Sequence, residues 1–186
     1  MFADVAALVE IATDESVLSA FAKRQGFSLG AEGICVVNAE GKGNMILCHA
    51  ILSGFGVRCH LVFDAGTGLR KVADADSKKK AASLRDNIAK NAKTLSYLRV
   101  TAEASPASAS KATHTVVEDG LDSYLKDDWP ARKERHLKLI ARGEGYVEGK
   151  HGPTYTEAAR TAGEPELLHE LTENVSAMVR QPSPRA

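Results

Sequence analysis

Acidic side chains follow two apolar runs of this chain and could together hold a divalent cation. Glu10 comes directly after the run Val5–Val9, and Asp64 directly after Val57–Phe63; Asp14 stands four residues beyond Glu10, one helical turn away. Carboxylates brought together repel one another unless a cation lies among them. Mg²⁺ and Mn²⁺ prefer oxygen ligands, and two such ions about 4 Å apart can activate water and stabilise the leaving oxygen in phosphodiester cleavage.

A second group of acids follows a fourth expected strand, Thr113–Val117. It consists of Glu118, Asp119 and Asp122. Ligand sites of open parallel sheets lie beyond the carboxyl ends of the strands, so we expect this group at the same edge as Glu10 and Asp64. The sequence predicts that all of these acids line one crevice.

Each acid also has a simpler interpretation. Glu10 or Asp14 could favour the N-terminus of the following helix, a role worth well under about 2 kcal/mol. Asp64 could be a turn residue before Gly66, or a phospho-acceptor as in receiver domains, although those place an acidic pair after their first strand. Spacing alone leaves these alternatives open.

Two lysines could contact phosphate. Lys42 lies in the segment EGKGNM, which offers an ammonium group and backbone amides to phosphate, or simply makes a tight turn between a strand and a helix. Lys150 lies in a glycine-containing segment, where a surface lysine is the plainer interpretation.

The elements that must position these residues follow from hydrophobic patterns. Val5–Val9, Gly33–Ala39 and Val57–Phe63 are nearly unbroken apolar runs, as expected for strands covered on both faces, and helical patterns separate them. This alternation predicts an α/β fold with a mainly parallel sheet, to which Thr113–Val117 adds a fourth strand. A helix is expected at about 77–98, a loop at 101–113, and only helices beyond the fourth strand and the segment EDGLDSYL that follows it.

Composition indicates an ordinary globular protein. Lys plus Arg and Asp plus Glu number 24 each, so the whole chain exerts no long-range attraction on a polyanion. The three cysteines have no CxxC spacing, and the N-terminus resembles no signal peptide, which predicts a cytoplasmic location with no membrane span. We expect a core at 1–128, a helical C-terminal extension at 129–180 and a disordered tail at 181–186.

Four segments, in order, resemble the TOPRIM domain of the overcoming lysogenization defect (OLD) family of nucleases. ALVEIATDESVL is similar to the opening LVEG motif, VVNAEGKGNM to the second strand and its Gly-Lys-Asn turn, LVFDAGTG to the strand with an Asp-x-Asp pair, and VVEDGLDSYL to the later acidic motif. The segment from Asp127 to Arg160 also resembles the C-terminal part of OLD-like proteins. The resemblance covers about residues 5–178 and implies a TOPRIM-like, Rossmann-like four-stranded sheet flanked by helices.

The resemblance also implies site residues. Glu10, Asp14 and Asp64 would hold one Mg²⁺ or Mn²⁺ ion, and Asp122, with Glu118 or Asp119, would help to hold a second. Lys150 would face the scissile phosphate and offset charge in the transition state. Glu10, Asp64 and Lys150 would thus be the catalytic residues, with Lys42 and Lys150 binding nucleic acid.

Two positions depart from the family pattern. Ile11 stands where the family has glycine, and Gly66 stands where it has the second Asp of the Asp-x-Asp pair. The change at residue 66 removes a cation ligand, although water or a substrate oxygen can fill a vacant position on Mg²⁺. Asp74 and Asp76 repeat the Asp-x-Asp letters ten residues later, just before the lysine-rich helix.

Two functions therefore compete. The first is a metal-dependent DNA endonuclease or nickase, which the resemblance links to phage defence or repair. The second is a degenerate TOPRIM module without cleavage activity, acting as a DNA-binding or regulatory subunit of an ATPase partner. OLD proteins usually carry an ATPase domain ahead of the TOPRIM domain, and none fits here. The chain is therefore a stand-alone TOPRIM protein, a partner of a separate ATPase chain, or a fragment, and the sequence leaves these three alternatives open. DNA is the expected partner, and an oligomer is compatible with either function.

Overall fold

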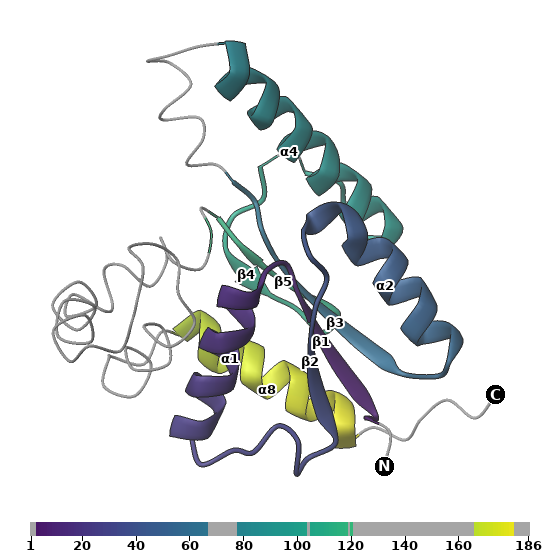
Figure 1. Cartoon of the computed structure of the whole chain (residues 1–186), viewed down its shortest axis with the longest axis vertical. Helices are drawn as coiled ribbons and strands as arrows, with labels where there is room; N and C mark the ends of the chain where they lie inside the picture. The colour runs from purple at the N-terminus through teal and green to yellow at the C-terminus, as the bar shows by residue number, and fades with distance from the viewer. Residues whose placement is uncertain (1–2, 67–77, 104, 119, 121–165, 181–186) are drawn as a thin grey trace, which may run out of the picture.

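A five-stranded sheet lies at the centre of the protein (Figure 1). The computed structural model describes residues 3–66, 78–103, 105–118, 120 and 166–180. In chain order the elements are β1 (Val5–Val9), α1 (Ala12–Arg24), β2 (Ile34–Asn38), α2 (Lys42–Gly54), β3 (Arg58–Asp64), α4 (Lys78–Tyr97), β4 (Ala109–Ser110), β5 (His114–Val117) and α8 (Glu166–Arg180).

The sheet is mostly parallel, which confirms the predicted fold class. Its strand order is β2-β1-β3-β5-β4, and β1, β2, β3 and β5 are the four strands expected from the sequence. The fifth, β4, pairs antiparallel with β5 through Ala109 and Ser110. The prediction of an unpaired loop over 101–113 is therefore wrong at these two residues, because two small residues carry no alternating pattern that would mark a strand.

Strand β1 has a neighbouring strand on each side and an apolar core on each face. Val5, Ala7 and Val9 belong to the apolar core on one face, whereas Ala6 and Leu8 belong to the core on the other. All five residues of β1 are fully buried. The unbroken apolar run that indicated a doubly covered strand is explained by this position.

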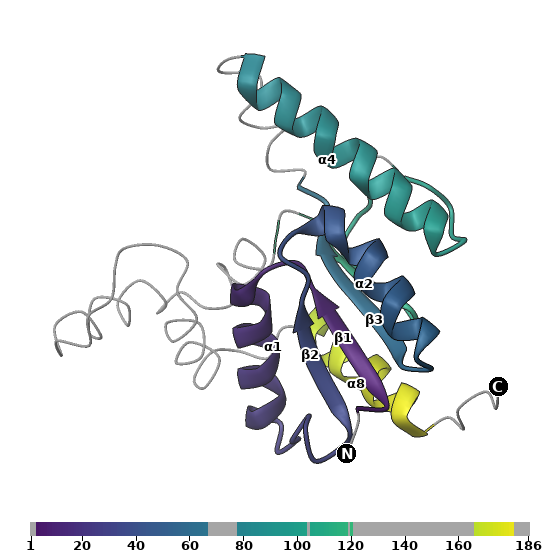
Figure 2. The ribbon, with the colours of Figure 1, turned by 45° about the vertical axis from the view of Figure 1, so that its right-hand side comes forward.

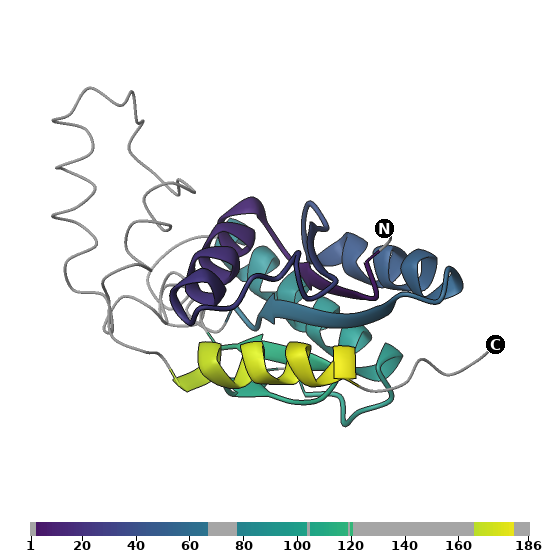
Figure 3. The same ribbon diagram turned by 90° about the horizontal axis from the view of Figure 1, so that it is seen from below.

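Helices α1 and α8 supply the first of these cores. Val17 and Phe21 of α1 and Leu168 and Leu171 of α8 pack with β1. The leucines of α8 recur at helical spacing and so form one apolar stripe. Figure 3 shows α8 running along the sheet.

Polar contacts also hold α8 in place. Asn174 Nδ2 donates a hydrogen bond to Ser110 Oγ at 2.9 Å, and the guanidinium of Arg58 donates to the carbonyl of Met178. The expected division into 1–128, 129–180 and 181–186 stays a prediction, since all of 121–165 and 181–186 lie outside the described residues.

Helices α2 and α4 cover the opposite face. Met45 of α2 and Leu95 of α4 are buried in the second core, and His49 Nδ1 lies 2.8 Å from Tyr97 Oη. The N-terminal turns of α4 project beyond the sheet (Figure 2). The outer side of α2 exposes Leu47, Ile51 and, just past its end, Phe55. No helix in the described ranges is long and apolar enough to cross a bilayer.

Candidate functional site

Glu10 and Asp64 leave the sheet at the same edge. Val9 is the register partner of Val62, so Glu10 lies one residue beyond this pair and Asp64 two residues beyond it. Backbone hydrogen bonds continue at this edge: Gly41 N–H donates to the Glu10 carbonyl at 2.8 Å, and Ala65 N–H donates to the Val117 carbonyl at 2.7 Å. Two acids 54 positions apart in the sequence thus face one rim of the sheet.

The carboxylate of Glu10 lacks the solvation of an ordinary surface acid. Its Oε2 is buried and accepts no hydrogen bond among the described residues. Burial, and then the negative charge of Asp64, raise the pKa of Glu10; the Lys42 ammonium and the backbone amides of Asp64 and Lys42 oppose this shift. An unpartnered buried carboxylate oxygen beside a second carboxylate is the chemistry that a hard divalent cation relieves.

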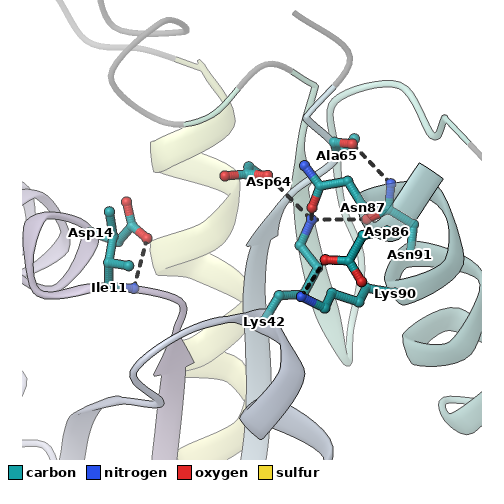
Figure 4. Close-up of polar contacts among 9 residues, drawn as sticks. All are labelled: Ile11, Asp14, Lys42, Asp64, Ala65, Asp86, Asn87, Lys90 and Asn91. Carbon is teal, nitrogen blue, oxygen red and sulfur yellow. Dashed lines mark hydrogen bonds and ion pairs between the residues drawn. The ribbon is translucent and has the colours of Figure 1, made fainter. Parts of the chain in front are cut away.

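Lys42 is the cation that the protein itself places at Asp64 (Figure 4). Its Nζ donates to Asp64 Oδ1 at 3.2 Å, to Asn87 Oδ1 at 3.1 Å and to Asn91 Oδ1 at 3.0 Å. Only 3% of Lys42 is exposed. An ammonium group has three N–H donors, and here each has an acceptor. A direct contact between Lys42 and DNA phosphate would require the ammonium to leave these partners.

The local backbone explains why Lys42 reaches inward. Gly41, with φ of +112°, precedes the first residue of α2, in a conformation that suits glycine. Asn44 Nδ2 donates to the carbonyls of Ala39 and Glu40, which holds the chain between β2 and α2 in a tight turn. Lys42 therefore begins α2 directly beside the carboxyl end of the sheet.

Asp14 contacts the N-terminus of α1. Its Oδ2 accepts a hydrogen bond from the backbone N–H of Ile11 at 3.2 Å (Figure 4). This is the helix-terminus role that the sequence left open for Asp14. Ile11, the residue that replaces the family glycine, is the donor.

The remaining predicted ligands are only partly described. Glu118 directly follows β5, its side chain is exposed, and its backbone N–H donates to Ser108 Oγ at 2.9 Å. Asp119, Asp122 and Lys150, together with Asp74 and Asp76, lie outside the described residues. The structure therefore brings Glu10, Asp64 and Lys42 together and keeps Asp14 on the adjoining helix end.

A side chain at residue 66 would displace the Asn87 amide and would strain the backbone. Its φ is +63°, and a Cβ built on it would lie 2.2 Å from Asn87 Nδ2 and 3.1 Å from Asn87 Cγ. The carboxylate expected at residue 66 is thus replaced by space that the Asn87 side chain fills from α4.

Sequence reasoning missed Asn87 and Asn91. A usable signal existed, because Asn91 lies between Ile88 and Leu95 on the apolar side of the predicted helix at 77–98. A polar residue at a core position of an amphipathic helix requires a buried partner. Asn91 is fully buried, and its Nδ2 donates to the Ala65 carbonyl at 2.9 Å.

The carboxylate oxygens at this edge suit a divalent cation, although few ligands lie within the described residues. Within the described parts of the chain, no group of three or more His, Cys, Asp or Glu side chains could hold a metal ion. Glu10 and Asp64 nevertheless offer oxygen ligands, and Glu10 Oε2 has no other partner there. These two carboxylates are the described residues that would hold the ion.

The first part of the chain matches a known family model, "Overcoming lysogenization defect protein-like, TOPRIM domain", over residues 1–65. The inferred resemblance to an OLD-like TOPRIM domain is thereby confirmed over residues 1–65. The matched part contains Glu10, Asp14, Lys42 and Asp64, and it ends just before Gly66.

Solved OLD structures have the same fold. A structure of the C-terminal region of the Xanthomonas campestris pv. campestris OLD protein, phased with iodine, superposes with a TM-score of 0.61 at 16% identity, covering 97% of this chain and 97% of that one. The C-terminal region of the Burkholderia pseudomallei OLD protein gives a TM-score of 0.56 at 17% identity, covering 96% of this chain and 100% of that one. No curated protein sequence matches the chain.

An OLD-like TOPRIM domain is a nucleic-acid-related, metal-binding domain, and TOPRIM domains generally bind divalent metals such as Mg²⁺. The placement of Glu10 and Asp64 at one sheet edge agrees with that general property. The identities to solved OLD structures are low, so those structures establish the fold of this chain and nothing finer.

Proposed function

We propose that this protein is a metal-dependent DNA endonuclease or nickase that hydrolyses phosphodiester bonds with Mg²⁺ or Mn²⁺. One observation supports the proposal most directly: Glu10 and Asp64 share an edge of the sheet, and Glu10 Oε2 is buried there without a hydrogen-bond partner among the described residues. The alternative uses of Glu10, as a helix-terminus or surface acid, do not require such burial.

Each residue has a distinct part in this proposal. Glu10 and Asp64 hold the ion, which when bound supplies a Lewis acid and lowers the pKa of a bound water. Lys42 fixes one oxygen of Asp64 and offsets its charge. Lys150 would stabilise negative charge on the scissile phosphate.

The other acids extend the site. Asp14 supports the end of α1 beside Glu10, and Glu118, Asp119 and Asp122 are the proposed ligands of a second ion. DNA is the proposed substrate, with action in the cytoplasm in phage defence or repair. A separate ATPase chain is a proposed partner.

A second function has its own support in Gly66. Because Asn87 fills the space of the missing carboxylate, the site has one ligand fewer than the Asp-x-Asp pattern. A TOPRIM module with this loss could serve as a DNA-binding or regulatory subunit of an ATPase partner without cutting DNA.

A plasmid-nicking assay separates the two functions. Supercoiled plasmid is incubated with the native chain, with Glu10→Gln and with Glu32→Gln, in Mg²⁺, Mn²⁺ or EDTA. Glu32 is an exposed acid ahead of β2, at the opposite edge of the sheet, and serves as the matched control. We expect nicking by the native chain and the control in metal only, and loss of about a hundredfold or more in Glu10→Gln.

The same assay can reject either function. Metal-dependent nicking that survives Glu10→Gln would rule out the proposed site. If the native chain binds DNA but never cuts it in either metal, the regulatory module is the better description.

A further inference from the structure

We propose that Asn87 of α4 has taken the place of the side chain missing at residue 66, and that Asn87 and Asn91 are positioning residues that hold Lys42 against the metal ligand Asp64. This inference rests on the proposed metal site and makes α4, which lies outside the 1–65 match, part of it.

A side chain at residue 66 and the Asn87 amide would occupy the same space. Asn87 Nδ2 lies 2.2 Å from the position that a Cβ at residue 66 would take, and Asp64 Oδ1 lies 3.5 Å from it. Real Cβ atoms do not approach another heavy atom to 2.2 Å, so a side chain at residue 66 and Asn87 in its present position exclude one another. The amide stands beside Asp64, where the second acid of an Asp-x-Asp pair would begin.

The acceptors of the Lys42 ammonium differ in charge. Lys42 Nζ has three acceptors, of which only Asp64 is charged; the other two are the amide oxygens of Asn87 and Asn91. Neutral amides orient the ammonium without competing for its charge, so its charge is neutralised by Asp64. Because Lys42 is 3% exposed, solvent reaches this pair only from the side of Asp64, 36% of whose side chain is exposed.

The two amides on α4 have helical spacing. Asn87 and Asn91 are four residues apart, so both lie on one side of the helix, the side that faces the sheet. Asn91 also donates to the Ala65 carbonyl at 2.9 Å, which ties the helix to the residue after Asp64. On the same helix, Asp86 pairs with Lys90 at 2.7 Å, and both of these side chains are exposed, so that pair provides a matched control.

The carboxylates of Glu10 and Asp64 both interact with the Lys42 ammonium, and an acid at residue 66 would add a further negative charge beside them. Restoring that acid should strengthen metal binding only when Asn87 is removed to make room. Gly66→Asp alone should not strengthen metal binding, because the new side chain must displace Asn87 and the backbone φ of +63° disfavours any residue other than glycine.

The main experiment measures Mn²⁺ binding by calorimetry in the native chain, Gly66→Asp, Asn87→Ala and the double variant. We expect Asn87→Ala to weaken Mn²⁺ binding about tenfold, as for other residues that orient a metal ligand. Gly66→Asp should lower the midpoint of thermal unfolding without tightening Mn²⁺ binding. The double variant should bind Mn²⁺ about tenfold more tightly than Asn87→Ala. Tighter binding by Gly66→Asp alone, with unchanged stability, overturns the proposal.

A metal-free measurement tests the positioning itself. In a double-mutant cycle, Lys42→Met and Asn87→Ala should be coupled in the free energy of unfolding, whereas Lys42→Met and Asp86→Ala should be additive. Additivity of Lys42 with Asn87 overturns the proposal. This cycle needs neither bound metal nor DNA cleavage.

The failure of this inference differs from the failure of the proposed function. A chain that shows the expected Mn²⁺ pattern but never nicks DNA lacks the nuclease activity and keeps the Asn87 replacement. A chain that nicks DNA and loses nicking in Glu10→Gln, while Asn87→Ala binds Mn²⁺ normally, keeps the nuclease and rejects the replacement.

Discussion

Lys42 Nζ lies 3.2 Å from Asp64 Oδ1 and joins the first residue of α2 to the last residue of β3. The lysine is buried, whereas 36% of the Asp64 side chain is exposed. The pair is therefore open on one side only, that of the acid. Asp64 can face a second cation from solvent while the protein holds its other side.

Replacing Lys42 should be costly even without metal. Lys42→Met leaves Asp64 without its ion pair and removes the cation from the two asparagines, so we expect a loss of about 3 kcal/mol in the free energy of unfolding. Urea denaturation measures this loss. Lys90→Met, which removes only an exposed pair on α4, should cost about 0.5 kcal/mol or less. Equal losses in the two variants would contradict the structural role of Lys42.

Glu10→Gln should stabilise the metal-free protein at neutral pH. The pKa of Glu10 is raised, mainly by burial and then by Asp64, so its contribution to stability is fully present below the unfolded value of 4.5 and is lost as pH rises through the folded pKa. Glutamine carries no charge and avoids that loss. Thermal unfolding in EDTA should show Glu10→Gln above the native chain at pH 7, with the gap closing near pH 4.

The same substitution should abolish stabilisation by Mn²⁺. The native chain gains stability from a bound ion in proportion to the logarithm of its concentration above Kd. Glu10→Gln should show no such gain, whereas Glu32→Gln should behave as the native chain. A gain in Glu10→Gln as large as in the native chain would place the ion elsewhere.

His60 should make the fold sensitive to acid. Burial lowers the pKa of His60 to about 4; a backbone contact with Ala112 opposes the shift, and the charge of His114 adds to it. The pKa of His60 is therefore lower in the folded than in the unfolded state. Its contribution to the free energy of unfolding is fully present above the unfolded pKa of 6.5. That contribution is lost as pH falls toward about 4, by roughly 3 kcal/mol in all.

A comparison of slopes tests this prediction. His60→Gln should show a weaker dependence of unfolding free energy on pH between 6.5 and 4 than the native chain, whatever its absolute stability. His169→Gln, at an exposed position on α8, should keep the native slope. An unchanged slope in His60→Gln would show that His60 does not titrate in this way.

Leu168→Ala should test whether α8 is integral to the core. Leu168 is fully buried with β1 and α1, so we expect a loss of about 3 kcal/mol in unfolding free energy. Glu170→Ala, at an exposed position on the same helix, should have little effect. A small loss in Leu168→Ala would mean that α8 packs loosely.

Much of the fold could be predicted because its strands are buried on both faces. The run Val5–Val9 matches β1 residue for residue, and the predicted helix at 77–98 differs from α4 by one residue at each end. The strand β4 escaped prediction because only pairing with Val116 and Thr115 defines it, and that pairing depends on tertiary structure.

The site was less predictable because the sequence pattern does not show which distant side chains a residue will contact. The meeting of Glu10 with Asp64 followed from the rule that parallel strands end at one edge. Lys42 was expected to contact phosphate or form a turn; its burial depends on Asn87 and Asn91, which are 45 and 49 residues away. Nothing near Lys42 in the sequence indicates those partners.

Strand β1, which delivers Glu10, has neighbours on both sides and a core on each face. Its amides should therefore exchange with solvent deuterium later than those of β4, a two-residue strand at the border of the sheet. If the sheet unfolds transiently from its outer strands, Glu10 should stay in register with Asp64. The sheet edge that carries Glu10 and Asp64 should thus persist during partial unfolding, and only complete unfolding should separate these two acids.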